Sequence, residues 1–374
     1  MKLCVFPNDP LKSYLEKGEI KERYFNPNNL FDEVHVISPI EKDVNEEQVK
    51  SLVGNAKLSI HPIGRLNLLN FKSKLKKVSH IVKEINPDII RSYNPLMQGW
   101  LATKIAKELS LPIIISIHNN YDKDVRDFYK KNKKILQYLK FVYSEKIIEK
   151  YCISNATKII CAYRFLVPYA DRLGGKDISV VYNRVNLSKF SPHIKPKLQF
   201  TKKTLIYVAR LDPEKNQECL IRAIKNLDVK LILIGKGNEF QKLNKLAEKL
   251  GTKDRIIFVQ SVPNKQLGEY YNSADIFVAP IKQGGISIPM LEAMACGLPL
   301  IISSRVGNYH EDIDDAIIFS RNTPEDFKKT IETLIQDSKL MSELSKKSLE
   351  TVKLLGEDIM EIKEEKIYRG LLNK

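Results

Sequence analysis

The 374-residue sequence lacks the marks of several protein classes. No apolar run approaches the ~18 residues that a membrane-spanning helix needs, so an integral membrane protein is not expected. The five cysteines are scattered, odd in number and never in Cys-x-x-Cys spacing, which argues against a disulfide framework or a zinc site and favours a reducing compartment. The apolar stretch Leu3–Phe6 is broken by Pro7, so it predicts a buried strand rather than a signal peptide. We therefore expect a cytoplasmic protein without a bound metal.

Acidic residues are scarce in the first half of the chain. Residues 1–200 hold 34 Lys and Arg and 20 Asp and Glu, a net charge of +14. Residues 201–374 hold 27 Lys and Arg and 25 Asp and Glu, a net charge of +2. The basic surface therefore belongs to one half, which indicates an anionic partner there: a membrane, an acidic glycan or nucleic acid. The Lys clusters carry no nucleic-acid-binding motif and few interleaved aromatic residues, so nucleic acid is the partner we do not expect.

The length and the apolar pattern predict two α/β domains. Short β-branched runs alternate with helical patterns on both sides of the polar stretch Ser191–Lys203, so we expect a doubly wound parallel sheet in residues 1–190 and another in residues 191–374. Ligands are expected at the carboxyl ends of both sheets, in the cleft between the domains. The expected strands are 2–6, 33–37, 89–92, 112–117, 158–161, 179–181, 204–209, 230–234, 255–258, 276–279, 299–303 and 316–319. The expected helices are 71–85, 96–109, 131–155, 163–173 and a charged helical tail from residue 324 onward.

The segment LIYVARLDPEKNQECLIRAI, residues 205–224, places two cations beside a predicted helix start. A buried strand ends at Arg210, and Lys215 stands before a helix that Asn216 could cap. Free backbone N–H groups at such a start favour an anion, to which Arg offers a fork and Lys a point charge. The alternative is a strand-end Arg and an exposed Lys without a ligand.

Two glycine pairs follow later strands. Gly235 and Gly237 form a Gly-x-Gly turn, which more often marks a tight strand-to-helix connection than a phosphate cradle. Gly284 and Gly285 stand before a short helix with Pro289 near its start. That helix holds Glu292 among apolar residues, where a carboxylate is costly to bury without hydroxyl or backbone donors. The alternative for this glutamate is the one solvent-facing side of the helix.

Together these segments resemble a known family. ARLDPEKN (209–216), the GKG turn (235–237) and PMLEAMACGLPLI (289–301) look like the donor-binding domain of the GT-B glycosyltransferases, above all the retaining family 4, the group 1 glycosyltransferases. VGNYHE (306–311) is similar to the family's VGGxxE loop, and VVYNRVNLSKFSP (180–192) to its inter-domain PNGVDxxxFxP segment. The resemblance runs in register from about residue 180 to 335.

The resemblance implies a fold and a reaction. The fold would be GT-B, two Rossmann-like domains facing across a cleft, with the last helix returning to the N-terminal, acceptor-side domain. The reaction would move a sugar from a UDP- or GDP-linked donor to a glycan or lipid-linked acceptor, with retention and without metal or other cofactor. An anionic membrane surface, on the inner face of the membrane, is a candidate partner because several relatives act on lipid-linked acceptors.

The resemblance also implies roles for single residues. Arg210 and Lys215 would neutralise the donor diphosphate and stabilise the leaving group. Glu292 would accept hydrogen bonds from the nucleotide ribose. His118, which follows the strand 112–117, stands where the family often has a His near the donor sugar. The other donor-binding positions implied by the resemblance are Gly235, Gly237, Gly284, Gly285, Ile286, Ser287 and Glu311.

One departure from the family pattern affects the donor sugar. The family has Glu-Gly-Phe-Gly where this chain has Gly284, Gly285, Ile286 and Ser287, so the first Glu of a pair is absent. Either the sugar is held differently or catalysis is weakened or lost. Two other hypotheses therefore stay open: a non-catalytic GT-B partner in a glycan-assembly complex, and a GT-B sugar-nucleotide epimerase.

Two Lys-rich helical segments, residues 71–85 and 130–150, combine basic clusters with apolar residues at helical spacing. One reading is a core-facing stripe with a solvated outer face. The other is docking on an anionic membrane, where each Lys contributes up to ~1 kcal/mol.

Overall fold

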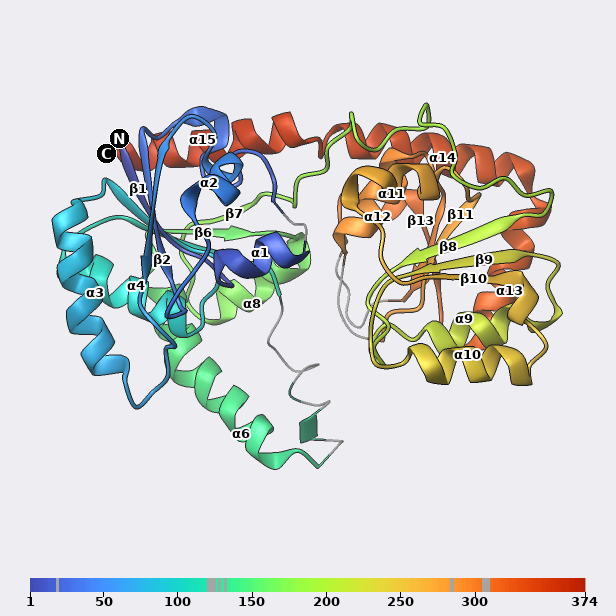
Figure 1. Ribbon diagram of the computed structural model, residues 1–374, viewed down its shortest axis with the longest axis horizontal. Coiled ribbons are helices and arrows are strands. Elements are labelled where there is room, and N and C mark those ends of the chain that lie inside the picture. The colour runs from blue at the N-terminus through green and yellow to red at the C-terminus, as the bar shows by residue number, and fades with distance from the viewer. Residues whose placement is uncertain are drawn as a thin grey trace. The chain divides into compact units, whose positions relative to one another are not determined.

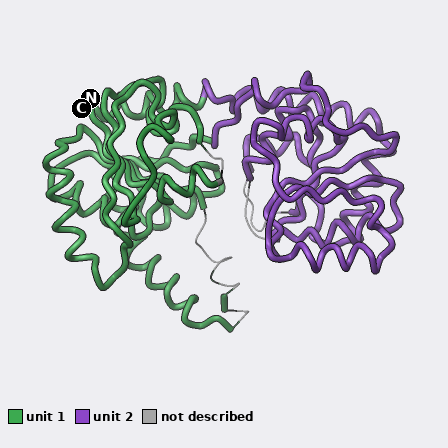
Figure 2. Tube along the Cα trace, in the orientation of Figure 1, with its two compact units in different colours: residues 1–182, 360–374 green, residues 183–359 purple. Residues whose placement is uncertain are grey.

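The computed structural model describes residues 1–17, 20–119, 126, 129–130, 133–282, 286–304 and 310–373 (Figure 1). The chain forms two compact units: unit 1 holds residues 1–182 and 360–374, and unit 2 holds residues 183–359 (Figure 2). Unit 2 begins at Asn183 rather than after residue 190, because the intervening residues are held within it. Val185 forms a parallel bridge with Gly356, and Asn186 Nδ2 donates to Glu357 Oε2 over 2.8 Å.

Unit 1 contains a seven-stranded parallel sheet in the described part of the chain. Its strand order is β3-β2-β1-β4-β5-β6-β7, so the order reverses between β1 and β4. The central strands are buried along nearly their whole length, which requires helices on both faces of the sheet. The strands are β1 (Lys2–Phe6), β2 (Glu33–Ser38), β3 (Lys57–Pro62), β4 (Ile89–Ser92), β5 (Ile113–Ile117), β6 (Lys158–Cys161) and β7 (Ile178–Val180).

The described helices of unit 1 include α3, α4 and α8 within or near the expected ranges 71–85, 96–109 and 163–173, and two short helices, α1 and α2, that were not expected. The expected helix 131–155 is divided by a π-helical turn over Ser144–Glu149. This turn holds two buried carboxylates, and Arg172 Nη1 donates to Glu145 Oε1 over 2.5 Å while the Tyr169 hydroxyl donates to Glu149. The helices are α1 (Leu11–Lys17), α2 (Glu46–Val49), α3 (Phe71–Ile85), α4 (Met97–Glu108), α6 (Ile135–Tyr143), α7 (Lys150–Ser154) and α8 (Val167–Arg172).

Unit 2 contains a second parallel sheet, with six strands in its described residues and the order β10-β9-β8-β11-β12-β13. Its strands are β8 (Thr204–Val208), β9 (Lys230–Ile234), β10 (Ile256–Val259), β11 (Ile276–Ala279), β12 (Leu300–Ser303) and β13 (Ile317–Ser320). Its helices are α9 (Gln217–Ala223), α10 (Phe240–Lys249), α11 (Asn264–Tyr271), α12 (Ile288–Ala295), α13 (Pro324–Gln336) and α14 (Ser338–Lys353).

The expected α/β architecture with two parallel sheets is confirmed, and one strand escaped the sequence analysis. This strand, β3, lies at the edge of its sheet, where only Leu58 is buried. Its polar residues and terminal Pro62 suit an edge and weaken the apolar signal that marks a strand.

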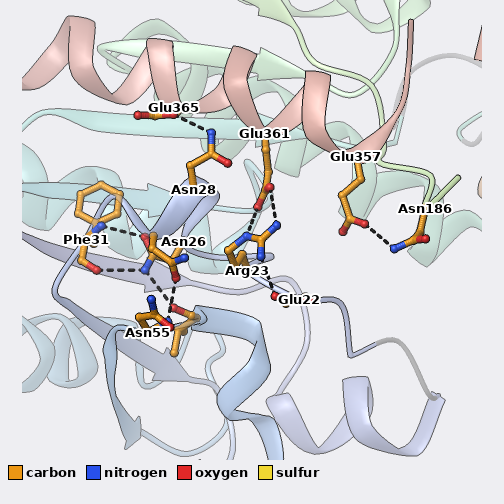
Figure 3. Close-up of polar contacts among 12 residues, drawn as sticks. Glu22, Arg23, Asn26, Asn28, Phe31, Asn55, Asn186, Glu357, Glu361 and Glu365 are labelled. Atoms are coloured by element: carbon orange, nitrogen blue, oxygen red, sulfur yellow. Dashed lines mark hydrogen bonds and ion pairs between the residues drawn. The ribbon is translucent and has the colours of Figure 1, made fainter. Parts of the chain in front are cut away.

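The C-terminal tail is divided into separate helices. Asp337 ends α13 and caps α14, since its side chain accepts a hydrogen bond from Leu340 N. The last helix, α15 (Glu357–Leu372), belongs to unit 1 from Met360 onward. Arg23 donates to both carboxylate oxygens of Glu361 over 2.9 Å, and Asn28 Nδ2 donates to Glu365 over 2.7 Å, as Figure 3 shows.

A histidine pair lies between β2 and the edge strand β3. His35 Nδ1 lies 3.1 Å from His61 Nε2, and His35 Nε2 lies 3.3 Å from Glu33 Oε2. Burial is the first cause that lowers the pKa of both rings below the usual 6.5, and the charge of His35 adds to it at His61. The folded protein therefore disfavours the protonated rings.

We expect unit 1 to lose stability as the pH falls below 6.5, because the unfolded chain then binds protons that the folded histidines resist. Above pH 6.5 this contribution is fully present. Urea unfolding at pH 7.5, 6.5 and 5.5 measures the effect. The His61→Gln variant should lose less stability over this interval than the wild type, and equal losses would contradict the assignment.

Candidate functional site

The described residues among those singled out in the second half of the sequence gather at one edge of the unit 2 sheet. The strand order reverses between β8 and β11, and the loops that follow β8, β9, β11 and β12 leave the carboxyl edge of the sheet there. In open parallel sheets this reversal point is where ligands bind.

The turn after β8 carries the two predicted phosphate ligands. It is fixed from three sides: Gln217 Nε2 donates to Arg210 O over 2.8 Å, Leu211 N donates to Lys236 O over 2.8 Å, and Lys282 N donates to Glu214 O over 2.9 Å. Hydrogen bonds from α9, from the β9 loop and from the β11 loop thus hold the backbone in place. The backbone that carries the two cations therefore has a defined position.

The two cations differ in their surroundings. The Arg210 side chain is 73% exposed, and its Nη1 lies 2.7 Å from Asp212 Oδ2. Lys215 is half-buried and makes no ion pair within 4.0 Å among the described residues. Burial, and then the charge of Arg210, lower the pKa of Lys215 below its usual value, against the pull of Glu214 and Asp212. An anion bound next to Lys215 and Arg210 would offset both the cost of burying the Lys215 charge and its repulsion by Arg210.

The predicted cap at Asn216 is wrong. Asn216 adopts a left-handed backbone, with φ of +54°, and its side chain makes no capping hydrogen bond to α9. Its Nδ2 instead donates to Asn322 Oδ1 over 2.8 Å, and Asn322 Nδ2 donates to Ile281 O over 3.0 Å. Asparagine tolerates this backbone better than most residues, so it serves the turn rather than the helix.

The Gly-x-Gly turn after β9 brings two loops together. A Cβ on Gly235, whose φ is +152°, would lie 2.0 Å from Ala209 O, and a Cβ on Gly237 would lie 2.3 Å from Leu211 O. Both glycines therefore have a packing reason, which is to let the β9 loop lie against the turn that carries Arg210. Their predicted contact with a donor stays a prediction.

Glu292 does not lie on a solvent-facing side of its helix. It is 5% exposed on α12, and its Oε2 accepts a hydrogen bond from the Tyr271 hydroxyl over 2.9 Å. Burial, followed by the Glu292 charge, raises the pKa of Tyr271 well above its usual value, so the phenol remains a donor. The expected helix boundaries hold: Pro289 lies in the first turn, and Gly297 takes a φ of +77° just past the end.

The remaining predicted positions are described in part. Gly284 and Gly285 lie outside the described residues. Ile286 is buried and Ser287 occupies the position before α12. Glu311 is fully buried, and its N–H donates to Asp314 Oδ2 over 2.8 Å.

His118 belongs to unit 1, where it follows β5 at the carboxyl edge of that sheet. Its ring stacks on Tyr93 with 6.0 Å between ring centroids and 10° between planes. Its predicted role near a donor sugar stays a prediction.

The sequence analysis missed the polar side chains that support the site. Tyr271 contacts Glu292, 21 residues away, and Asn322 contacts Asn216, 106 residues away, whereas Gln217 binds the backbone of Arg210 only seven residues before it. No local pattern marks the first two partners, since they become neighbours only in the folded sheet.

Two features are absent from the described part of the chain. No group of three or more His, Cys, Asp or Glu residues within it could hold a metal ion. No helix within it is long and apolar enough to span a bilayer.

Two family models match the chain, one for each half. The model "Glycosyltransferase Family 4" matches residues 30–189, and "Glycosyl transferases group 1" matches residues 191–351. An uncharacterized glycosyltransferase of Methanocaldococcus jannaschii is 25% identical over 298 residues, 78% of each chain. The alpha-monoglucosyldiacylglycerol synthase of Acholeplasma laidlawii is 24% identical over 372 residues, covering 92% of this chain and 90% of the relative.

Two solved structures share the fold over their whole length. Sucrose-phosphate synthase from Thermosynechococcus elongatus superimposes with a TM-score of 0.76 at 16% identity, with 100% of both chains covered. HepE of Anabaena, in complex with UDP, superimposes with a TM-score of 0.75 at 15% identity, again with 100% of both chains covered.

Proposed function

The chain belongs to the group 1 glycosyltransferases of the GT-B fold, and on this premise we propose that its donor is a nucleotide diphosphate sugar bound by unit 2. The observation that carries the proposal is Lys215, a half-buried cation that makes no ion pair within 4.0 Å among the described residues and stands beside a second cation, Arg210. A diphosphate would bring negative charge to Lys215, which has no ion pair among these residues, and its oxygens would compete with Asp212 for the exposed Arg210.

The proposed chemistry follows from that charge. When the bond between the anomeric carbon and the diphosphate oxygen breaks, negative charge grows on the leaving group. Arg210 and Lys215, held on a fixed turn, would stabilise it as it develops. The new bond joins the anomeric carbon to the acceptor oxygen, and the acceptor proton passes to a donor phosphate oxygen. This route needs neither a metal ion nor a nucleophilic side chain, and it would retain the anomeric configuration.

Glu292 would bind the sugar ring of the nucleotide. Its carboxylate is buried and partly engaged by Tyr271, which fixes its orientation. A carboxylate held in this way accepts hydrogen bonds from vicinal hydroxyl groups of a ribose.

We propose a lipid-linked acceptor. One relative that aligns over 92% of this chain is named as a synthase of alpha-monoglucosyldiacylglycerol. Unit 1 is the more basic unit, with 34 Lys and Arg against 23 Asp and Glu, whereas unit 2 has 27 against 22. Such a surface suits an acceptor presented by anionic lipids.

Nucleotide binding is tested by thermal unfolding with EDTA present, in UDP, GDP and ADP and their sugar conjugates. A ligand at about 100 times its Kd adds about 2.7 kcal/mol to the folded state, so one nucleotide should raise Tm by several degrees. The shift should vanish in Arg210→Ala and Lys215→Met. It should persist in Lys346→Ala, which removes a 78% exposed lysine from α14. No shift with any nucleotide at millimolar concentration would refute the donor site.

A further inference from the structure

The exposed apolar side chains of unit 1 are concentrated in two segments. Seven of the ten described in this unit lie either just before α3 or along α6 and the π-helical turn after it. Leu69 is 98% exposed and Leu136 is 81% exposed, values that a packed side chain does not reach. The seven are Leu68, Leu69, Ile135, Leu136, Leu139, Tyr143 and Ile147; we call them the apolar tips.

Helix α6 carries four of the apolar tips on one side, and the π-helical turn after it carries a fifth, Ile147. Ile135, Leu139 and Tyr143 follow one another at four-residue intervals, which places them along one side of a helix, and Leu136 and Ile147 extend this stripe. None of the residues of α6 is buried, although the helix reads ILQYLKFVY. Phe141, on another side of the helix, is half-buried and stacks on Tyr129, whereas the stripe of apolar tips is exposed and suits another occupant.

Both segments are cationic, and the two acidic residues of the π-helical turn, Glu145 and Glu149, are buried. Residues 64–83 hold six Lys and Arg and no Asp or Glu. Residues 129–144 hold five Lys and no Asp or Glu. Lys140 of α6 stands beside the apolar stripe, and Lys133 and Lys134 immediately precede the helix, where Lys133 takes a left-handed backbone with φ of +55°. An apolar stripe bordered by lysines is typical of helices that lie in a membrane interface.

The two segments are joined by one layer of helices. Phe71 of α3 stacks on Trp100 of α4, with 4.0 Å between centroids, and Lys104 lies over both Trp100 and Tyr151 of α7. Helix α4 packs against α3, α7 and the π-helical turn. In Figure 1 the start of α3 and the whole of α6 lie at the lower edge of unit 1.

We propose that the apolar tips and the lysines around them dock unit 1 on an anionic lipid bilayer. The leucines and isoleucines would enter the acyl boundary, while the long Lys side chains would reach the lipid phosphates. The inference rests on the proposed lipid-linked acceptor, because docking would bring the enzyme to a substrate held in the bilayer. A second copy of the chain is a poorer occupant, since a two-fold contact would set the same cations against each other.

Vesicle sedimentation tests the docking surface. The full-length protein should bind vesicles of phosphatidylglycerol and phosphatidylcholine but not phosphatidylcholine alone, and high salt should weaken the binding. The double variants Leu136→Ser/Leu139→Ser and Leu68→Ser/Leu69→Ser should each lower the partition coefficient about ten-fold or more. Leu354→Ser is the matched control, because Leu354 is 65% exposed in unit 2. Its partition coefficient should equal that of the wild type.

The single tryptophan of the chain gives a second readout. Trp100 contacts Phe71, close in sequence to Leu68 and Leu69, so energy transfer from Trp100 to a dansyl-labelled lipid should accompany binding. The nucleotide-induced rise in Tm should be the same in all the leucine variants, which separates a failure of docking from a failure of the donor site. Three results would overturn the proposal: no binding of the wild type to anionic vesicles, undiminished binding of both double variants, or a dimer in solution that the α6 variant dissociates.

Discussion

Replacing Glu364 by alanine should lower the free energy of unfolding of unit 1 by about 3–5 kcal/mol, the usual cost of removing one partner from a buried ion pair. Arg91 of β4 and Glu364 of α15 form that pair, and their side chains are only 4% and 7% exposed. Arg91 also donates to Ser116 Oγ through Nε and Nη2 and to the Tyr368 hydroxyl over 2.7 Å. Without the carboxylate, a guanidinium would remain buried among neutral partners.

Urea unfolding followed by Trp100 fluorescence measures this loss, because the single tryptophan lies in unit 1. Glu365→Ala is the matched control on the same helix. Glu365 is more exposed, at 19%, and it pairs with Arg369 and Asn28, so its loss should cost below about 1 kcal/mol. The double variant Arg91→Met/Glu364→Leu should recover most of the stability, since it removes both charges and keeps the volume. Equal losses in Glu364→Ala and Glu365→Ala would disprove the special cost of the buried pair.

This pair explains why the end of the chain belongs to unit 1. Arg23, Asn28 and Arg91 come from three places in the first hundred residues, and all bind one helix through Glu361, Glu365 and Glu364. Phe31 adds an edge-to-face contact with Tyr368. Each partner lies more than 250 residues from its mate, so no local pattern could predict the contacts, and the sequence analysis expected the return of this helix only through the family resemblance.

The fold was predictable where a local pattern has one physical cause. A parallel strand that is covered on both faces is mainly apolar, so β1, β5, β9 and β12 stand out as short apolar runs. The edge strand β3 is mostly not buried, and its sequence mixes Ser59, His61 and Pro62 with apolar residues. Its own residues therefore do not predict a strand, although β3 pairs with β2 along its whole length.

The site was predictable in the same uneven way. Arg210 and Lys215 share one turn, so their spacing alone places them together at the end of β8. The burial of Glu292 was suggested by its apolar neighbours, but its partner Tyr271 on α11 was not. Asn216 shows the limit of local reasoning. Its position before α9 suggested a helix cap, but its side chain instead donates a hydrogen bond to Asn322, which lies 106 residues away.

Lys215→Met should reduce kcat/KM about 10²–10³-fold, the usual effect of removing one group that stabilises charge in a transition state. The same substitution should leave the ligand-free protein as stable as the wild type or more stable. Burial and Arg210 both disfavour the Lys215 charge in the folded protein, so the lysine costs free energy until an anion binds. A residue kept for folding would show the opposite pattern, with lost stability accompanying lost activity.

Measuring sugar transfer and urea unfolding on the same preparations separates these two explanations of Lys215. Lys215→Arg keeps the charge but not the compact shape of an ammonium, so it should retain part of the activity and of the nucleotide-induced rise in Tm. Lys236→Met is the matched control, because Lys236 is exposed on the neighbouring β9 loop and its backbone, not its side chain, holds Leu211. If Lys215→Met lost stability while nucleotide still raised its Tm as in the wild type, Lys215 would be a structural residue. The charge on the donor diphosphate would then need another partner on the turn.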